Sequence, residues 1–211
     1  MFLDHWYYII GGDKILNVIG RIAFPIFAFT LSEGYVHTRN LKKYMFRLLI
    51  FAIIIQTPSI LFNYNYPMNV FFTLFLGLFT IFILDFKKIW LKLPISGIIK
   101  FILILAVLVL AQRFNFDYGA YGIVLIMIFF IFRNNKFQIL MNFFILNLIN
   151  FIFPQIFDLS KLQFFSLISL IFIFMYNGKK RKSMYMKYFF YLFYPLHFFI
   201  LEIINKFFNK I

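Results

Sequence analysis

The sequence contains no cysteine, and only 13% of its 211 residues are charged. The absence of cysteine excludes disulfide bonds, thiolate nucleophiles and cysteine-based metal sites. Acidic residues are the scarcest charged type, with 7 Asp and Glu against 21 Lys and Arg. A soluble domain is about 25% charged. So small a charged fraction could not cover the surface of a soluble fold and argues against one.

The sequence instead carries long apolar runs, with 64% hydrophobic residues and a mean hydropathy of +0.89. Soluble domains are about 45–50% apolar. The runs lack the period-two alternation of membrane barrels, so they predict an all-α, polytopic integral membrane bundle in one domain, residues 1–211. A spanning helix needs about 20 residues. Nine spans are expected, the first only about half a span long, at 1–11, 16–37, 44–63, 69–85, 95–112, 119–133, 137–154, 161–176 and 187–207.

The basic residues alternate between the two sides of this predicted topology. Loops on one side carry Arg39, Lys42, Lys43, Arg47, Lys87, Lys88, Lys92, Arg133, Lys136, Lys179, Lys180, Arg181, Lys182 and Lys187, whereas loops on the other carry Lys14, Arg113 and Lys161. Basic loops stay in the cytoplasm, which predicts a cytoplasmic N-terminus and an external C-terminus. The net charge of +14 then orients the protein, and no nucleic-acid partner is needed to explain it.

The first two apolar runs contain the ionisable residues Asp4, His5 and Arg21 in or near their first halves. Charged side chains are costly at membrane depth and are functional candidates there. Asp4 and His5 are adjacent, so both can border one cavity, or they emerge harmlessly at the interface. Arg21 can extend to the interface, bind an anion, or pair with Asp4 across helices. Pro25 should kink the second span.

Further polar residues lie near the end of the second span and in the middle of the ninth. Glu33, His37, Thr38, Arg39 and Asn40 could hold a phosphate-rich ligand, or form a solvated loop. His197 lies mid-span, where a membrane histidine is either hydrogen-bonded core or functional. Its neighbours Tyr191 and Tyr194, and the helix-breaking Pro195, favour function.

Asn69, Thr73 and Gly77 recur every four residues and therefore share one helix face. This pattern indicates either small-residue helix packing, which we favour, or the wall of a cavity. Asp117 is predicted to lie in an outer-loop turn.

Four segments together resemble the TraX family of polytopic membrane proteins: the Asp4-His5 pair, GRIAFPIFAFTLSEGYVHTRN with KKYMFRLL, the stretch from Asn69 to Gly77, and FYPLHFFIL. The family is named for conjugation, and its type case is linked to N-terminal acetylation of pilin. TraX is in turn similar to transmembrane acyltransferases, among them the acyltransferase-3 enzymes and the lysosomal heparan N-acetyltransferase. These enzymes carry an acyl group, usually from acetyl-CoA, to an acceptor on the other side of the membrane.

The resemblance implies roles for particular residues. His5 matches the catalytic histidine by position and would be general base or acyl carrier, with Asp4 orienting it. Arg21 would stabilise the developing negative charge or hold the donor carbonyl. The donor phosphates would be held by Thr38, Arg39, Lys43 and Arg47, and the cavity would be lined by Glu33, His37, Asn69, Thr73, Tyr194 and His197. The acyltransferase-3 pattern also has a basic residue before the histidine, at a position that would precede Met1. The short first span likewise indicates a late start codon or a member that lacks the first half of this helix.

The resemblance therefore implies an acetyl-CoA-dependent O- or N-acyltransferase of the bacterial inner membrane, without a metal. Its acceptor would be a surface glycan, a glycolipid or the N-terminus of pilin. Two other functions stay open at this point. Membrane-embedded Asp, His and Arg also suit a transporter or flippase, although no inverted repeat is evident. A non-catalytic membrane subunit of a conjugation or secretion apparatus is the third hypothesis.

Overall fold

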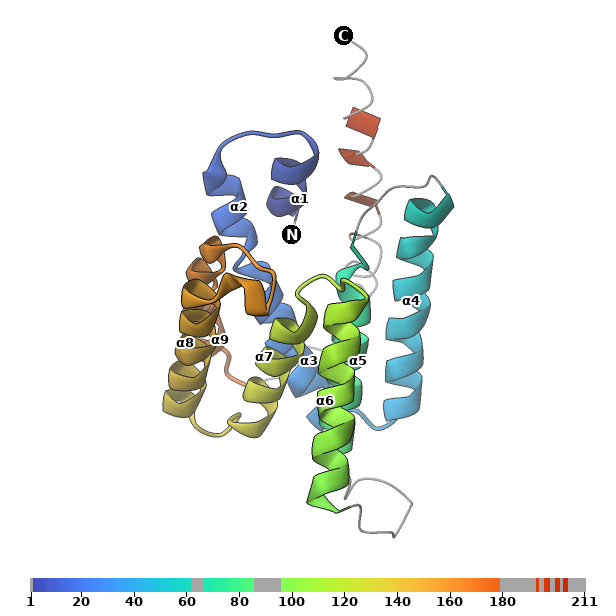
Figure 1. Ribbon diagram of the computed structural model, residues 1–211, viewed down its shortest axis with the longest axis vertical. Coiled ribbons are helices and arrows are strands. Elements are labelled where there is room, and N and C mark those ends of the chain that lie inside the picture. Colours follow the sequence, from blue (N-terminus) through green and yellow to red (C-terminus); the bar gives the residue numbers. More distant parts are fainter. Residues whose placement is uncertain are drawn as a thin grey trace. The chain divides into compact units, whose positions relative to one another are not determined.

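The computed structural model describes residues 2–61, 67–85 and 96–178, together with residues 193, 196, 197, 200, 201, 203 and 204. These residues form two compact units. Unit 1 comprises residues 1–26 and 160–211, so it joins the two ends of the chain, and unit 2 comprises residues 27–159. The described parts of both units are helical (Figure 1), as the sequence predicts.

Unit 1 contains a hairpin of two short helices, α1 (Phe2–Ile9) and α2 (Lys14–Gly20). The turn between them is made by Gly11 and Gly12, with φ of +98° and +124°, a region that side-chain-bearing residues rarely adopt. Asp13 then caps α2, because its carboxylate accepts a hydrogen bond from the backbone N–H of Ile15 at 2.9 Å. Unit 1 also contains the 3₁₀ helix η3 (Lys161–Ile168), which packs against α2 and continues into α9 (Ser169–Phe174).

The predicted second span is interrupted at Arg21 and Ile22, and a new helix, α3 (Ala23–His37), begins there. Pro25 is the third residue of α3. Its ring replaces the N–H that would bond the carbonyl of Arg21 and crowds that carbonyl, so the helix breaks one turn before the proline. The predicted disturbance of the second span is therefore present, as a break that places Pro25 in the first turn of α3.

Unit 2 contains most of α3, followed by α4 (Leu41–Leu61), α5 (Val70–Leu84), α6 (Gly97–Arg113), α7 (Gly119–Ile131) and α8 (Lys136–Ile152), and then a 3₁₀ turn η2 (Pro154–Ile156). Successive helices run in opposite directions (Figure 1), and α5 packs against α4, α6 and α7. The turns after α3 and α7 therefore lie at one end of the unit, and the turn between α6 and α7 lies at the other.

The positions of α4 to α8 agree with the predicted spans to within three residues, and α5 to α8 are one to two residues shorter than predicted. The predicted span at 187–207 lies largely outside the described residues. Side-chain caps fix three of the starts: Asn69 caps α5, Ser96 caps α6 and Asn135 caps α8. Within the described residues, only the segment Lys14–His37, which comprises α2, the break and α3, is long and apolar enough to cross a membrane by length and hydropathy. Other apolar helices have only 10–17 residues and are too short for this criterion: Val70–Leu84, Gly119–Ile131, Lys136–Ile152 and Lys161–Phe174.

The core of unit 2 depends on a close approach of α5 and α7. A Cβ at Gly77 would overlap Cδ1 of Ile126, so glycine allows the Ile126 side chain to pack in its present position. Leu78, Ile81, Ile123 and Phe129 are fully buried around the contact. The small-residue packing predicted for this face of α5 is therefore confirmed at Gly77.

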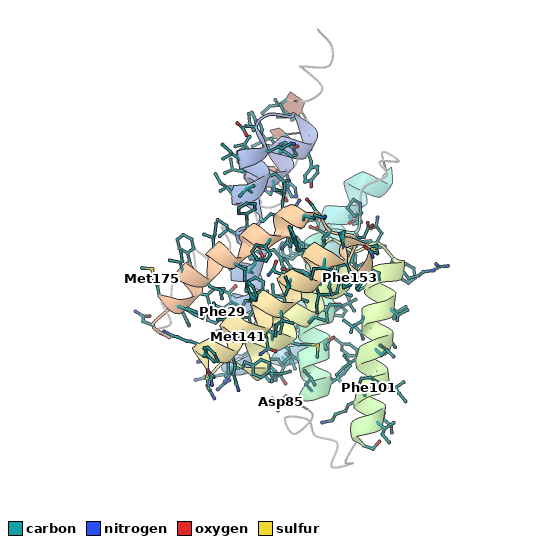
Figure 2. The ribbon with its side chains drawn as sticks, turned by 60° about the vertical axis from the view of Figure 1, so that its left-hand side comes forward. Phe29, Asp85, Phe101, Met141, Phe153 and Met175 are labelled. Carbon is teal, nitrogen blue, oxygen red and sulfur yellow. The ribbon has the colours of Figure 1, made fainter. Side chains whose placement is uncertain are left out.

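The outer faces of α6 and α8 carry large apolar side chains that no described part of the protein covers. Phe101 of α6 is 66% exposed and Phe137 of α8 is 68% exposed. Figure 2 shows such side chains projecting outward along both helices, with Phe101 and Met141 labelled. Isolated apolar side chains are normal on a soluble surface, but continuous apolar faces mark contact with another apolar phase.

Candidate active site

The close pairing of α1 and α2 places their polar side chains together. A Cβ at Gly20 would lie 2.5 Å from Cβ of Asp4 and 3.0 Å from its Cα, so glycine is needed where the two helices touch. Asp4 and Tyr8 share a face of α1, while Asn17 and Arg21 lie four residues apart on α2. Asp4, Asn17 and Arg21 are all buried.

These four side chains form a network of hydrogen bonds and one ion pair. Asn17 Nδ2 donates to Asp4 Oδ1 at 2.9 Å, and Arg21 Nε donates to Asn17 Oδ1 at 3.3 Å. Arg21 Nη2 lies 3.7 Å from Asp4 Oδ1 and donates to the Tyr8 hydroxyl at 2.7 Å. The pairing of Asp4 with Arg21 across helices, one of the predicted alternatives, is confirmed. Asn17 bridges the two charges, which keeps the buried pair compensated.

His5 points to a second partner from the far end of the chain. Its Nδ1 lies 2.9 Å from Nε2 of His197, a residue 192 positions later, and the two rings are inclined by only 9°. The ring centroids are 5.1 Å apart. Because the two nitrogens are much closer than the centroids, they lie on the facing edges of two nearly parallel rings, as an N–H···N hydrogen bond requires.

The backbone assigns the protons in this histidine pair. His197 Nδ1 lies 2.7 Å from the carbonyl oxygen of Phe193, which can only accept, so His197 Nδ1 carries a proton. In a neutral imidazole the other nitrogen is then an acceptor. His5 Nδ1 must therefore donate to His197 Nε2, and the lone pair of neutral His5 lies on its Nε2. A lone pair at this atom is what a general base or an acyl carrier uses.

Asp4 and His5 have different hydrogen-bond partners. The two residues are adjacent on α1 and point about 100° apart. Asp4 therefore faces Asn17 and Arg21, while His5 faces His197. In this geometry His197 lies at hydrogen-bond distance from His5, whereas Asp4 bonds Asn17 and pairs with Arg21. Tyr194 lies outside the described residues.

Sequence reasoning missed three elements of this site: Asn17, Tyr8 and the carbonyl of Phe193. Asn17 had a usable signal, because it is the one polar side chain between Lys14 and Arg21 and lies one helical turn before the arginine. Tyr8 lies one turn after Asp4 and could have been found in the same way. The carbonyl of Phe193 left no trace in the sequence, because every residue has one.

The predicted donor-binding residues lie in unit 2, around the turn from α3 to α4. Asn40 Oδ1 accepts from the backbone N–H of Lys43 at 2.9 Å and so caps α4. The Tyr44 ring covers Gly34, where a Cβ would lie 3.0 Å from the hydroxyl, and the Arg47 guanidinium carbon lies 5.8 Å from the centre of that ring. Within the described chain, Arg47 Nε is buried and has no hydrogen-bond partner.

Other members of the predicted set also lie at this turn. Arg39 and Lys43 are exposed and Thr38 is half-buried. His37 is exposed, and its Nδ1 lies 2.9 Å from the carbonyl oxygen of Glu33, one helical turn earlier. We call Thr38, Arg39, Lys43, Arg47 and the first turn of α4 the basic corner. Backbone N–H groups at a helix N-terminus together with cationic side chains form an arrangement that binds phosphate.

Asn69 and Thr73 belong to unit 2, whereas His5 and His197 belong to unit 1. Asn69 donates to the carbonyl of Ala52 at 2.8 Å and to Gln56 Oε1 at 2.9 Å. The Thr73 hydroxyl bonds the carbonyl of Asp117. Both side chains therefore hold α5 to its neighbours.

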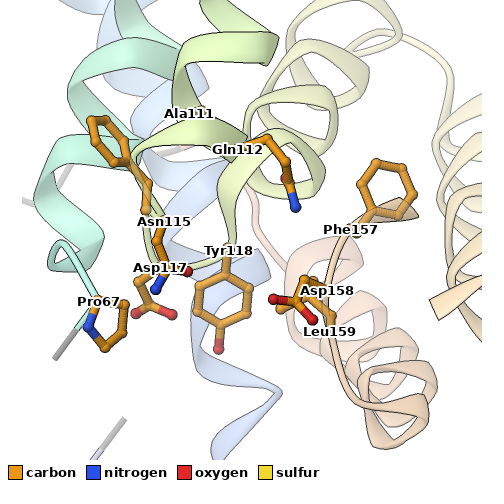
Figure 3. A pocket seen from close by; sticks show the side chains of 10 residues that line it. Pro67, Ala111, Gln112, Asn115, Asp117, Tyr118, Phe157, Asp158 and Leu159 are labelled. Carbon is orange, nitrogen blue, oxygen red and sulfur yellow. The ribbon is translucent and has the colours of Figure 1, made fainter. Parts of the chain in front are cut away.

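Asp117 lies in the turn between α6 and α7, as predicted. This turn and the segment after α8 enclose a small cavity of about 130 Å³ (Figure 3). The carboxylates of Asp117 and Asp158 lie on either side of Tyr118 at its mouth. The backbone of Asn115, Tyr118 and Asp158 is left-handed here, with φ of 50°, 61° and 54°. Neither Asn69 nor Thr73 lines the cavity.

Within the described ranges, no group of three or more His, Asp or Glu side chains could hold a metal ion.

Comparisons with known proteins agree with the sequence resemblance. A stretch of 61 residues is 39% identical to the probable fimbrial assembly protein FimC, serogroup H1, of Dichelobacter nodosus. The match covers 26% of this chain and 25% of that protein, so it spans about a quarter of the relative's length. No solved structure matches. The model of the TraX protein family matches residues 1–205. The chain therefore belongs to the TraX protein family.

Proposed function

We propose that this protein is an integral-membrane acyltransferase, which transfers an acyl group, acetyl by expectation, from cytoplasmic acyl-CoA to an acceptor on the other side of the membrane. The observation that carries the proposal is the His5–His197 pair beside the Asp4–Arg21 ion pair. Unit 1 gathers two histidines, a carboxylate and a guanidinium in a chain that is only 13% charged. Such clusters are costly in an apolar environment and mark functional sites there.

The proposed reaction needs one base and one cation. His5 Nε2 removes the proton from the acceptor N–H or O–H, and the acceptor atom bonds to the thioester carbonyl carbon. Arg21 stabilises the oxyanion that forms on the carbonyl oxygen. The carbon–sulfur bond then breaks, and the CoA thiolate takes the proton from His5. If His5 is instead the acyl carrier, its Nε2 bonds to the carbonyl carbon first and expels the CoA thiolate. The acceptor atom then displaces His5 from the acyl group, and the acceptor's proton goes to the thiolate.

The basic corner is the proposed donor site. CoA carries several phosphates, and the corner offers Arg39, Lys43, the buried Nε of Arg47 and the first N–H groups of α4. The same end of unit 2 holds Arg133 and Lys136 in the turn after α7, whereas the opposite end holds Asp117 and Asp158. Basic residues stay in the cytoplasm, so this end would face the cytoplasmic donor.

Multi-pass insertion in the bacterial inner membrane is part of the proposal. It is supported by the exposed apolar faces of α6 and α8, which lipid would cover, and by the alternating helix directions of unit 2. The chain has no cysteine, so single cysteines report sidedness cleanly. Lys136→Cys should react with a membrane-impermeant maleimide only from the cytoplasmic side, and Asp158→Cys only from the opposite side. Labelling of both from one side would exclude this topology.

The first acceptor to test is the N-terminal amine of pilin. The relative's name concerns fimbrial assembly, which supports a role in pilus biogenesis for this chain. Surface glycans and glycolipids remain in the proposal as further acceptors, because a hydroxyl group, like an amine, carries a proton that His5 could remove.

The deciding experiment measures acyl-CoA binding and acyl transfer by protein reconstituted in liposomes with radiolabelled acetyl-CoA. Arg39→Ala should weaken donor binding, whereas Arg113→Ala, an exposed arginine at the other end of unit 2, should not. His5→Ala should lower transfer by about 10²–10⁴-fold while donor binding persists. Gln138→Ala on the exposed face of α8 is the control for transfer. Donor binding that is absent in the wild type, or transfer that survives in His5→Ala, would refute the respective half of the proposal.

A second candidate function has one observation in its favour. The match to a fimbrial assembly protein also suits a non-catalytic membrane subunit of a pilus assembly apparatus. That function predicts stoichiometric co-purification with a pilus component, without any acyl-CoA binding. A complex whose formation is unchanged by His5→Ala and Arg39→Ala would favour it over the enzyme.

A further inference from the structure

We propose that His197 is a positioning residue that holds His5 in the tautomer with its lone pair on Nε2, and that shares the proton which His5 takes up. The inference rests on the proposed function, because a positioning residue needs a reaction to serve. Its structural basis is a series of two hydrogen bonds. It runs from the carbonyl of Phe193 through the ring of His197 to the ring of His5, whose other nitrogen is Nε2.

The direction in which protons are donated along this series of hydrogen bonds is set by the backbone carbonyl of Phe193. A carbonyl oxygen cannot donate, so the proton on His197 Nδ1 is fixed by Phe193. The remaining nitrogen of His197 must then accept, which places a proton on His5 Nδ1. If either bond were lost, His5 could carry its proton on Nε2, and this nitrogen could not act as a base.

The same geometry gives the transferred proton two places to reside. When His5 Nε2 takes a proton, its imidazole becomes a cation with protons on both nitrogens. The Nδ1 proton can then move to His197 Nε2, which leaves His5 neutral and His197 doubly protonated. In that state both N–H groups of His197 still have acceptors: the carbonyl of Phe193 and Nδ1 of His5. No atom has to move far, because the two nitrogens are 2.9 Å apart.

A purely structural role for His197 would also explain a buried, hydrogen-bonded histidine. Its exposed fraction is only 3%. The two roles differ in what a glutamine would do at this position. The amide oxygen of glutamine can accept from His5 Nδ1, but an amide does not take up a proton near neutral pH. His197→Gln therefore preserves the tautomer of His5 and removes proton sharing, whereas His197→Leu removes both.

The first test is nitrogen-15 NMR of histidine-labelled protein in lipid bilayers. The chain has only three histidines, so His5, His37 and His197 can be assigned by single substitutions. We expect a coupling across the hydrogen bond between His5 Nδ1 and His197 Nε2, and a neutral His5 that is protonated on Nδ1. The same tautomer should persist in His197→Gln and become a mixture in His197→Leu. His37 is the spectroscopic reference and should not change. An Nε2-protonated His5 in the wild type would overturn the proposal.

The second test measures acyl transfer by the same two variants, with kcat separated from the KM for acetyl-CoA. We expect His197→Gln to lower kcat about tenfold and His197→Leu to lower it about a hundredfold, in each case with KM unchanged. Equal rates for both variants and wild type would overturn the inference. A parallel rise in KM and loss of folded protein, with kcat per folded molecule unchanged, would assign His197 a structural role and also overturn it.

The two tests separate failure of this inference from failure of the proposed function. If the wild type transfers acyl groups but His5 lacks the expected tautomer, the inference fails and the enzyme assignment stands. If the tautomer and coupling are present but no acyl group is transferred and no acyl-CoA binds, the proposed function fails, and the catalytic meaning of the pair fails with it.

Discussion

Units 1 and 2 both bury polar side chains, but they satisfy them in different ways. In unit 1 the buried charged groups at α1 and α2 bond side chain to side chain, as in the Asp4–Asn17–Arg21 network. In unit 2 three buried polar side chains, those of Thr73, Thr80 and Asn147, bond to a backbone carbonyl. Thr80 bonds the carbonyl of Leu76, and Asn147 bonds that of Phe143.

This difference separates a scaffold from a site. A side chain bonded to its own helix holds a local geometry, and a threonine or asparagine carries no charge that chemistry could use. A charged network across helices in an apolar chain is expensive unless every member is partnered. Unit 1 has the groups that could react, and unit 2 has the long helices and the basic corner. The following substitutions test this division, from the largest expected effect to the smallest.

Arg21→Leu should have the largest effect on stability. It leaves the Asp4 carboxylate buried without a cation, which costs about 3–5 kcal/mol. The thermal midpoint in detergent should fall by about 2–4 °C for each kcal/mol. The double variant Asp4→Asn, Arg21→Leu should recover much of the loss, because no charge remains buried. A double variant that is no more stable than Arg21→Leu would contradict the ion pair.

Matched asparagine-to-leucine changes compare the units directly. Asn17→Leu removes hydrogen bonds to two charged groups and should cost about 1.5–3 kcal/mol. Asn147→Leu in unit 2 removes neutral hydrogen bonds, including the one that it accepts from the Tyr121 hydroxyl, and should cost about 1 kcal/mol. Thermal unfolding reports both values. Only Asn17→Leu should also lower acyl transfer per folded molecule, and equal activity losses would remove the distinction between the units.

Gly20→Ala tests the contact that brings α1 to α2. The added Cβ meets the backbone and Cβ of Asp4, neither of which can rotate away, so the helices must separate at a cost of about 1–3 kcal/mol. Gly97→Ala is the matched control, because nothing lies within 4 Å of its new Cβ. We expect destabilisation for Gly20→Ala only, measured as the shift in thermal midpoint. Similar shifts for both would show that α1 and α2 do not pack in this way.

Asn135→Ala should have the smallest effect. It removes the cap of α8 by deleting the acceptor of the Gln138 N–H, at a cost of about 1 kcal/mol. Acyl transfer per folded molecule should not change, because α8 belongs to the scaffold. A fall in transfer measured at equal amounts of folded protein would place unit 2 helices in the reaction and would weaken the comparison.

Much of the scaffold could be predicted from the sequence. Apolar runs bounded by Asn, Pro and charged residues located α4 to α8 within a few residues, because a helix ends where its polar neighbours prefer water or a cap. Pro25 predicted a disturbance of the second span, and the break lies about one turn before it, since a proline acts on the carbonyl four residues earlier. The caps Asn69 and Ser96 begin α5 and α6 one and two residues after the predicted starts, because an N-cap residue itself lies outside the helix.

The candidate site was only partly predictable. Charge scarcity alone was enough to single out Asp4, His5, Arg21 and His197, because each is out of place in an apolar run. The pairing of these residues with one another could not be predicted, because it depends on which way each side chain points after the helices pack.

The sequence by itself determined the helical class, the helix positions and the short list of ionisable residues, since local hydrophobicity and capping act between neighbours in the chain. Only the tertiary structure decided that Asp4 faces Arg21 and that His5 faces His197 across 192 positions of sequence. It also decided which nitrogen of His5 carries the proton. That choice depends on one backbone carbonyl, at Phe193, whose place beside His197 Nδ1 arises from folding and is not encoded in any residue type.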